Sequence, residues 1–295
     1  MEVPSTLRLP DGRTLAYDDI GDPSAPPVVY LHGTPDSRLS RHPDDSVTEA
    51  AGVRLLAVDR PGAGDSDPHD AATLVSVGHD LAVLLDHLAL PSAILLGWSA
   101  GGLFALAAAT VLGERVVGIG LVAPVPPVEA YAEAALVAAL GPGRRGFVEL
   151  VGEVPALKLA SEVAPYLVPD PLTPDTAVEH VLAGAGEQGR RELAEVPGAA
   201  AVLAAALMAS VRRGRAGLVH DVALQLEPGL DLSEVRVPVR AFHGTEDGVS
   251  PPEVGTWLVS RLPNAVLDLS PGASHHLLFP RWRGILRALR RDAAI

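Results

Sequence analysis

The chain has 295 residues and no cysteine; 48% of the residues are hydrophobic, only 4% are aromatic, and the formal net charge is −13. This hydrophobic content excludes an intrinsically disordered chain, and the length suits either two domains or one large α/β unit with an insertion. The lack of cysteine excludes disulfides, cysteine-zinc sites, iron–sulfur clusters and a cysteine nucleophile, and the acidic charge disfavours nucleic acid and anionic membranes as partners.

The N-terminus and the longest apolar run bear on where the protein is located. The first residues lack the basic and apolar regions of a signal peptide, and the apolar run at 199–209 is shorter than the roughly 20 residues that a membrane-spanning helix needs. We therefore expect a soluble, cytoplasmic protein with a small-molecule substrate and no nucleic-acid or membrane partner. The oligomeric state stays open, and a homodimer is one option.

The first 123 residues alternate short apolar runs with segments whose apolar residues recur at helical spacing. Short apolar runs bounded by Gly and Pro are typical of strands that are buried on both faces. In chain order, we expect strands at 5–9, 14–18, 28–31, 55–58, 93–96 and 116–122, and helices at 46–51, 72–88 and 101–112. This order predicts an N-terminal hairpin that turns at Asp11 and Gly12, followed by a parallel sheet with crossover helices.

The composition changes after residue 123 and changes back at residue 239. Between these points Ala, Gly and Pro are frequent, and we expect helices at 128–140, 175–182 and 199–211. The strand and helix pattern then returns, with strands at 239–243 and 265–269 and helices at 252–262 and 280–291. We therefore predict a split α/β core of residues 1–123 and 239–295 with a helical insertion at 124–238. The arginines at 281–291 are expected on the solvated face of the last helix.

The strongest local motif is the sequence GWSAG at 97–101, which joins a buried strand directly to a helix. G-x-S-x-G in this setting is the pattern of a nucleophile elbow, in which a sharp turn raises the serine hydroxyl above the sheet. Any side chain at position 97 or 101 would collide with the turn, so both positions need glycine. The pattern predicts Ser99 as a nucleophile and the backbone N–H of Ala100 as a donor to an oxyanion.

A second oxyanion donor is expected from the sequence HGTP at 32–35, which follows the strand at 28–31. Proline has no N–H, so the candidate donor is the backbone N–H of Thr34, with its hydroxyl as a possible second donor. We interpret His32 as a structural histidine that holds this loop.

A serine needs a base to accept its proton and an acid to orient that base. Two strand ends supply candidates: Glu246 and Asp247 follow the strand at 239–243, and His275 and His276 follow the strand at 265–269. The carboxyl ends of parallel strands meet at one edge of a sheet, so both loops are expected near Ser99. The residues alone leave the choice within each pair open.

These motifs together resemble the α/β-hydrolase superfamily over nearly the whole chain. In chain order, the matching motifs are the HGTP loop, the DRPGAGDS turn at 59–66, the elbow and the HGTED loop at 243–247. The resemblance implies that the DRPGAGDS turn is structural. The resemblance implies an α/β-hydrolase fold, with a mostly parallel sheet of about eight strands and a helical cap after the sixth. It favours Asp247 and His275 as the partners of Ser99, although Ser274 stands where the family commonly has Gly. A serine nucleophile argues against the dehalogenases and epoxide hydrolases of this fold, which use aspartate.

The sequence therefore predicts a serine hydrolase with the triad Ser99, Asp247 and His275 and oxyanion donors at Thr34 and Ala100. The expected substrate is an ester or thioester with an apolar group, because the predicted cap is rich in Ala, Leu and Val. Alternatives are a lyase or cyclase on the same fold, an aminopeptidase-type peptidase, and a catalytically silent binding protein.

No metal-binding or phosphate-binding spacing occurs in the sequence, so neither a metal nor a cofactor is expected.

His220 and Asp221 lie next to each other in the predicted insertion. Adjacent residues on a helix point apart, so we interpret this pair as solvated or as an interdomain contact rather than as an acid–base pair.

Overall fold

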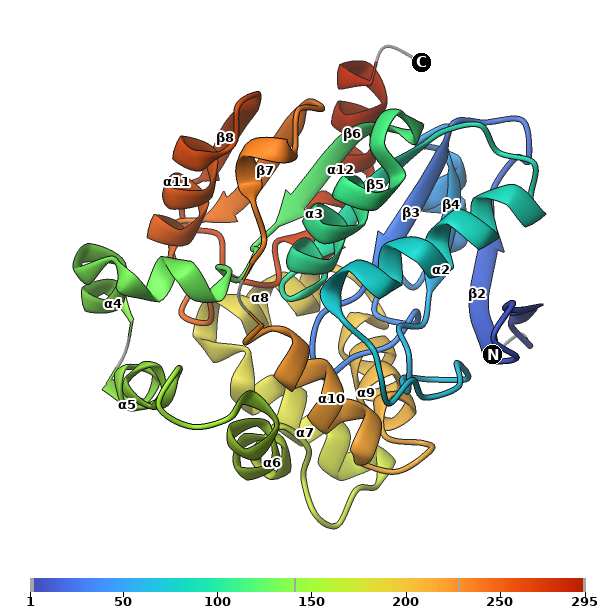
Figure 1. The fold of residues 1–295 in the computed structure, drawn as a ribbon. Helices are drawn as coiled ribbons and strands as arrows, with labels where there is room; N and C mark the ends of the chain where they lie inside the picture. The colour runs from blue at the N-terminus through green and yellow to red at the C-terminus, as the bar shows by residue number, and fades with distance from the viewer. Residues whose placement is uncertain (1–2, 141, 228, 294–295) are drawn as a thin grey trace.

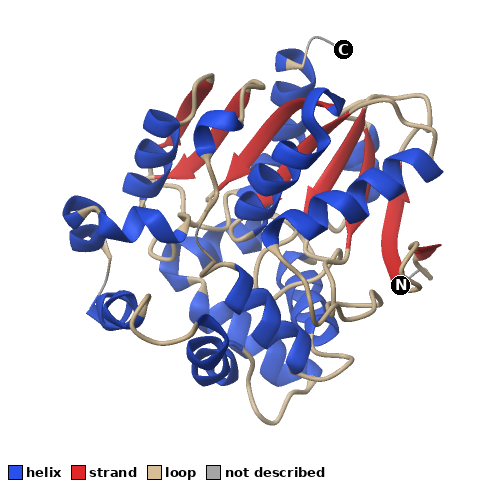
Figure 2. Ribbon diagram, in the orientation of Figure 1, coloured by secondary structure: helices blue, strands red, loops and turns tan. Residues whose placement is uncertain are grey.

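An eight-stranded, mostly parallel sheet lies at the centre of the computed structural model, which describes residues 3–140, 142–227 and 229–293 (Figures 1 and 2). The strands are β1 (Ser5–Arg8), β2 (Thr14–Ile20), β3 (Pro27–Leu31), β4 (Arg54–Val58), β5 (Ala93–Trp98), β6 (Val116–Val122), β7 (Val239–Gly244) and β8 (Ala265–Ser270). Their order across the sheet is β1-β2-β4-β3-β5-β6-β7-β8. Strand β2 pairs antiparallel with β1 and β4, and all other pairs are parallel. The predicted hairpin and parallel sheet are confirmed.

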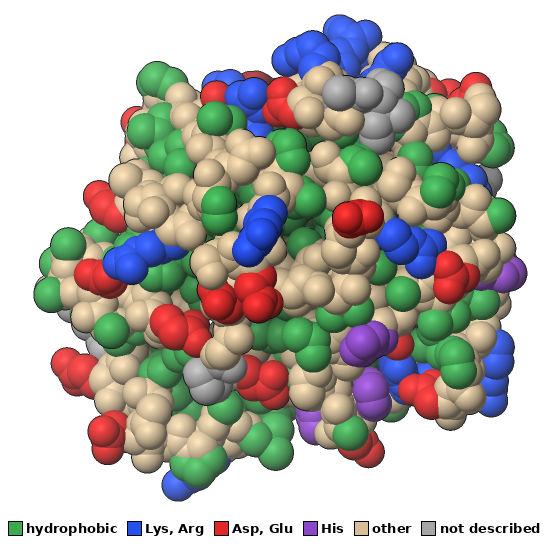
Figure 3. All heavy atoms as spheres, turned by 45° about the horizontal axis from the view of Figure 1, so that its top comes forward, with side chains coloured by type: hydrophobic (Ala, Val, Ile, Leu, Met, Phe, Trp, Pro, Cys, Tyr) green, Lys and Arg blue, Asp and Glu red, His purple; other side chains and the backbone are tan. Residues whose placement is uncertain are grey.

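Helices cover both faces of this sheet, as Figure 2 shows. The helices that pack on it are α1 (Asp45–Glu49), α2 (Leu74–His87), α3 (Gly101–Leu112), α11 (Pro252–Arg261) and α12 (Leu278–Asp292), with a 3₁₀ turn η1 (Gly113–Arg115) before β6. One apolar core contains residues of α2, α3 and α11, and a second contains residues of α12 on the opposite face. The arginines of α12 are exposed on the side away from its buried Trp282 and Leu286, as predicted, and Figure 3 shows basic side chains gathered there.

The described residues between β6 and β7 form a series of helices. They are η2 (Val128–Ala132), α4 (Ala134–Ala139), α5 (Pro142–Leu150, side chains described from 146 on), α6 (Ala156–Leu167), α7 (Pro174–Gly184), α8 (Gly186–Glu195), α9 (Ala199–Ser210), α10 (Ala216–Leu224) and η3 (Leu232–Glu234). In Figure 1, helices α6, α7, α9 and α10 gather beyond the arrowheads of the strands, at the carboxyl edge of the sheet.

Two of the predicted helices in this segment are confirmed as α7 and α9, but the prediction of one helix over 128–140 is wrong. Glu133 has extended backbone angles, with φ −87° and ψ 107°, and these separate η2 from α4. Helices α5, α6 and α8 were not expected from the sequence, whereas α10 agrees with the helix assumed for His220 and Asp221. Glycines within α8 and a proline at position 165 within α6 obscure the helical pattern there.

Within the described ranges, no single helix is long and apolar enough to cross a membrane. Helices α8 and α9 meet the length and composition criteria only as a pair, and the pair is bent by 109°.

Candidate active site

Ser99 lies in the sharp turn between β5 and α3, where the sequence motif places it. Its φ angle is 54°, in the left-handed region that non-glycine residues rarely adopt. A Cβ atom at Gly97 would collide with the backbone of Gly101, and one at Gly101 would collide with the carbonyl oxygen of Leu31. The N–H of Ser99 donates to the carbonyl oxygen of Val122 at 2.9 Å. The two glycines and this hydrogen bond hold the strained serine at the carboxyl edge of the sheet.

His275 and Asp247 form a buried hydrogen-bonded pair near this turn. Nδ1 of His275 lies 2.8 Å from Oδ2 of Asp247, while Oδ1 accepts the N–H groups of Val249 and Ser250 at 2.8 Å each. Burial alone would raise the pKa of Asp247, but the charge of His275 and the hydrogen bonds from His243, His275 and Ser250 lower it well below its ordinary value. Asp247 is therefore an ionised carboxylate that fixes the orientation of His275.

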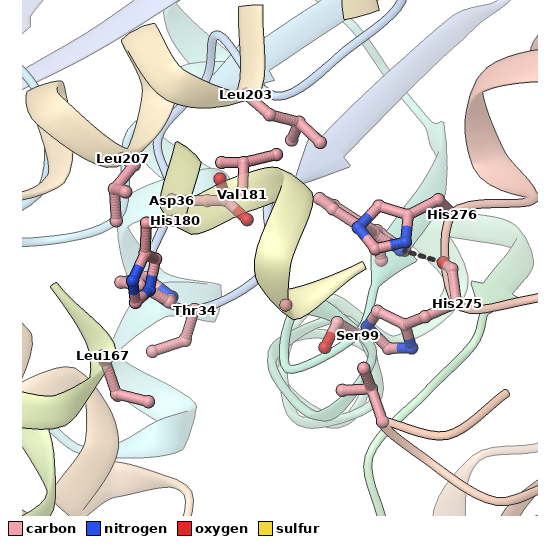
Figure 4. Close-up of a pocket in the computed structure, with 14 residues that line it drawn as sticks. Thr34, Asp36, Ser99, Leu167, His180, Val181, Leu203, Leu207, His275 and His276 are labelled. Atoms are coloured by element: carbon pink, nitrogen blue, oxygen red, sulfur yellow. Dashed lines mark hydrogen bonds between the residues drawn. The ribbon is translucent and has the colours of Figure 1, made fainter. Parts of the chain in front are cut away.

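Ser99 and His275 line the same cavity, and Figure 4 shows the imidazole beside the serine side chain. Because Nδ1 faces Asp247, the ring has its Nε2 atom available on the opposite side. The indole N–H of Trp98 donates to the carbonyl oxygen of His275 at 3.1 Å and so anchors the backbone of this loop to β5. The structure thus brings Ser99, His275 and Asp247 together, whereas Glu246 is exposed to solvent.

His276, the alternative base, lies in a different environment. Its ring is buried edge-on to Trp98, and its Nδ1 atom has no hydrogen-bond partner among the described residues. Burial, together with the charge of His275, lowers the pKa of His276 from 6.5 to about 3. His276 is neutral at pH 7, and no carboxylate of the described residues forms a hydrogen bond with its ring, so the geometry favours His275.

The predicted oxyanion donors lie near Ser99, because Ala100 follows it in the chain and Thr34 lines the same two cavities. Neither backbone N–H, of Thr34 or of Ala100, has an acceptor among the described residues. The hydroxyl of Thr34 donates to Asp221 and accepts from Arg60 Nη2 and Gln225 Nε2, each at 3.0 Å. Because that hydroxyl is committed to Asp221, only the backbone N–H of Thr34 remains available to a ligand.

His32 has the structural role that the sequence suggested. Its Nδ1 lies 2.8 Å from the carbonyl oxygen of Gly33, and its Nε2 accepts the N–H of Arg60 at 3.2 Å. Burial, and then the charge of Arg60, lower the pKa of His32 well below 6.5. A neutral His32 therefore joins the loop after β3 to the turn after β4.

Asp221 on α10 also makes a contact that the sequence left open. It is buried and forms an ion pair with Arg60, whose guanidinium is buried as well. The solvated interpretation is therefore wrong for Asp221, which instead joins α10 to the turn after β4. The role of Arg60 is structural, because it also donates to the carbonyl oxygens of His32 and Gly33.

Two acidic residues near the site were not identified from the sequence. Glu192 of α8 is buried and accepts the N–H of Ser274 at 2.8 Å and its hydroxyl at 2.5 Å. Glu192 thereby holds the loop that carries His275. The sequence feature that could have indicated this contact is Ser274, which stands where the family commonly has glycine. Asp36 follows the HGTP sequence directly and lines the cavity beside Ser99. Its position immediately after that loop was the only signal.

Two cavities share Thr34 and Ser99 in their linings, and Figure 4 shows the smaller one. The smaller, of about 170 Å³, is partly polar and is lined by Asp36, His180, His275 and His276 among others. The larger, of about 430 Å³, is mostly apolar. Its apolar lining from the segment between β6 and β7 includes Tyr131, Phe147, Val163, Leu167, Val222 and Leu226. No group of three or more His, Asp or Glu side chains in the described part of the chain is placed to hold a metal ion.

Comparisons with known proteins agree with this architecture. Residues 26–281 match the family model described as alpha/beta hydrolase fold. The chain is 30% identical over 118 residues to a proline iminopeptidase of Arabidopsis thaliana, a match that covers 39% of this chain and 31% of that protein. The chain spans less than half of the length of the curated relatives that it matches.

Solved structures match over almost the full length. The esterase RhEst1 from Rhodococcus sp. ECU1013 has a TM-score of 0.69 and 24% identity, over 100% of this chain and 99% of that chain. A bromoperoxidase from Bacillus anthracis has a TM-score of 0.71 and 21% identity, over 99% of each chain. At these identities the similarity establishes the shared fold.

Proposed function

The chain belongs to the α/β hydrolase fold family, and on this premise we propose that it is a serine hydrolase that cleaves esters or thioesters through an acyl-enzyme on Ser99. The observation that carries the proposal is the arrangement around Ser99, a strained serine at the mouth of two cavities beside a histidine that is paired with a buried carboxylate. Such an arrangement is what nucleophilic catalysis by serine requires.

The proposed reaction has two stages. His275 Nε2 takes the proton of Ser99 as Oγ attacks the carbonyl carbon, and the N–H groups of Thr34 and Ala100 stabilise the oxyanion. The bond to the leaving group then breaks, and His275 gives the proton to the departing oxygen or sulfur. Water, deprotonated by His275, next attacks the acyl-enzyme and releases the acid and free Ser99. Asp247 stays ionised throughout and stabilises the imidazolium.

In this proposal residues 124–238 act as a cap that shapes the substrate site. Residues of α6, α7, α9 and α10 line the two cavities together with core residues of the Ser99 and Thr34 loops. The mostly apolar lining of the larger cavity supports an apolar acyl group as its ligand.

The test is hydrolysis of a panel of p-nitrophenyl esters by the wild-type protein and by Ser99→Ala. The substitution is expected to lower kcat by a factor of about 10⁴ or more. Ser260→Ala, at an exposed position on α11, is the matched control and should keep wild-type activity. In parallel, a fluorophosphonate should label Ser99, as seen by mass spectrometry of the labelled peptide. Ester hydrolysis that persists in Ser99→Ala would exclude the acyl-enzyme, and a folded protein that neither labels nor hydrolyses would indicate a binding protein.

A further inference from the structure

We propose that Asp36 determines substrate specificity by binding a positively charged group in the leaving alcohol, so that the preferred substrates are esters of short amino alcohols with an apolar acyl group. This inference rests on the proposed function for the reaction itself. It adds the chemical class of the alcohol and the residue that recognises it.

The first observation is that the Asp36 carboxylate has no partner. It makes no hydrogen bond and no ion pair with any described residue, and its half-buried side chain lines the smaller cavity. Burial raises the pKa of Asp36 well above 3.8, with a further increase from the charge of Asp221 that the charge of Arg60 opposes. An unpaired carboxylate in such a place is costly, and a bound cation would compensate for that cost.

The neighbouring arginine does not fill this role. The Arg60 guanidinium pairs with Asp221 through two hydrogen bonds, at 2.7 and 2.9 Å, and its remaining donors reach the carbonyl oxygens of His32 and Gly33 and the hydroxyl of Thr34. Asp36 is the only carboxyl group among the described residues that line the smaller cavity, and none of those residues is a lysine or an arginine.

The second observation is the short distance between Asp36 and the nucleophile. A Cβ atom at Gly33 would lie 3.0 Å from Oδ2 of Asp36 and 3.3 Å from Cβ of Ser99. The carboxylate and the serine thus flank one glycine, and the absence of a side chain there lets them face the same space (Figure 4). A cation bound to Asp36 would lie only a few bonds from an ester oxygen at Ser99. This limits the alcohol to a short spacer between oxygen and nitrogen.

The third observation assigns the two cavities to the two halves of the ester. His275, which would protonate the leaving oxygen, lines the smaller cavity but not the larger one. Ala100, a proposed oxyanion donor, lines the larger cavity but not the smaller one. The leaving alcohol must face the acid that protonates it, so it belongs in the smaller cavity beside Asp36. The acyl chain then extends into the larger, apolar cavity.

The experiment compares two esters of the same shape, 2-(dimethylamino)ethyl hexanoate and 3-methylbutyl hexanoate. They share the acyl chain and differ only in a protonated nitrogen that replaces a CH group of the alcohol. For the wild-type protein at pH 7, kcat/KM should favour the cationic ester by roughly ten- to a hundredfold, as for a hydrogen bond between charged groups. In Asp36→Asn this ratio should fall to near one. Asp175→Asn makes the same chemical change at an exposed position of α7 and should keep the wild-type ratio.

Three results would overturn the inference. They are a wild-type ratio near one, a ratio that survives Asp36→Asn, and a stronger preference for a cation in the acyl part, tested with 3-methylbutyl 6-aminohexanoate. If Asp36→Asn does not fold, Asp36→Ser serves for the same comparison.

A binding measurement separates this inference from the proposed function. Titration calorimetry with the Ser99→Ala protein should show tighter binding of 2-(dimethylamino)ethanol than of 3-methylbutan-1-ol, and the difference should vanish when Asp36→Asn is added. If both esters resist hydrolysis but this difference is found, the proposed reaction fails and the cation site stands. If the neutral ester is cleaved in a Ser99-dependent way and the difference is absent, the reaction stands and the cation site fails.

Discussion

The Arg60 guanidinium and the Asp221 carboxylate form a buried, two-point ion pair between residues 161 positions apart, with Nε–Oδ1 at 2.7 Å and Nη2–Oδ2 at 2.9 Å. Arg60 follows β4 in the sheet, and Asp221 lies on α10. Both also contact Thr34, through its hydroxyl. The pair therefore couples the position of α10 to the loop that presents a proposed oxyanion donor.

We predict that Asp221→Asn destabilises the protein by about 3–5 kcal/mol, because it leaves the buried Arg60 charge without its carboxylate. The free energy of unfolding is measured by urea denaturation. The control is Asp86→Asn, which breaks the exposed ion pair between Arg115 and Asp86, an aspartate whose side chain is 71% exposed. It should cost less than about 1 kcal/mol. Equal effects of the two substitutions would contradict the importance of burial.

The Asp247 carboxylate supports a second prediction, on rate. Asp247→Asn should lower kcat for ester hydrolysis by roughly 10³–10⁴-fold, because the amide no longer holds His275 in the productive tautomer. The neighbouring Glu246→Gln, at an exposed position, removes one carboxylate from the same loop and should retain wild-type kcat. A loss of rate in Glu246→Gln that matches the loss in Asp247→Asn would show that the acid has been assigned to the wrong residue.

The sequence was sufficient to predict the features that local sterics and burial impose. The turn at Ser99 requires glycine at 97 and 101, and the parallel strands are apolar because both faces of the sheet are covered. These requirements act within a few residues, so they leave a pattern in the sequence. The choice of His275 over His276 needed the family resemblance as well, and the structure adds the physical reason, the contact of His275 with Asp247.

The features that the sequence did not reveal depend on contacts between distant segments. Glu192 acts on a serine 82 positions away, and nothing in α8 itself marks it as buried. Asp36 is unusual only because none of the described residues forms an ion pair or a hydrogen bond with it in the folded chain. The break at Glu133 likewise has no glycine or proline to signal it. A single sequence records local constraints well and pairings of this kind poorly.

His276 leads to a prediction on stability and pH. Its pKa in the folded protein is about 3, below the ordinary 6.5, so the unfolded chain binds this proton first as the pH falls. Stability is therefore lost below about pH 6.5, with a slope from this residue that approaches roughly 1.4 kcal/mol per pH unit and ends near pH 3. Urea denaturation of His276→Gln between pH 4 and 7 should show a slope that is smaller by this amount.

The control for this measurement is His87→Gln, which removes one histidine from an exposed position at the end of α2. His32, whose folded pKa is also lowered, contributes to the slope with the same sign in every variant, so the difference between variants isolates His276. If the slopes of wild type and His276→Gln coincide, then the ring of His276 is protonated in the folded protein and its environment has been misread.

Val163 on α6 tests the assignment of the larger cavity to the acyl chain. It lines that cavity but not the smaller one, so Val163→Trp should shorten the space for the acyl group alone. With p-nitrophenyl esters, kcat/KM for octanoate should fall roughly tenfold relative to butyrate. Leu157→Trp, at a position of the same helix that is 51% exposed, should leave the chain-length profile as in wild type. Equal losses for octanoate and butyrate would indicate a damaged site, and a change in alcohol preference at constant acyl preference would place the acyl chain in the other cavity.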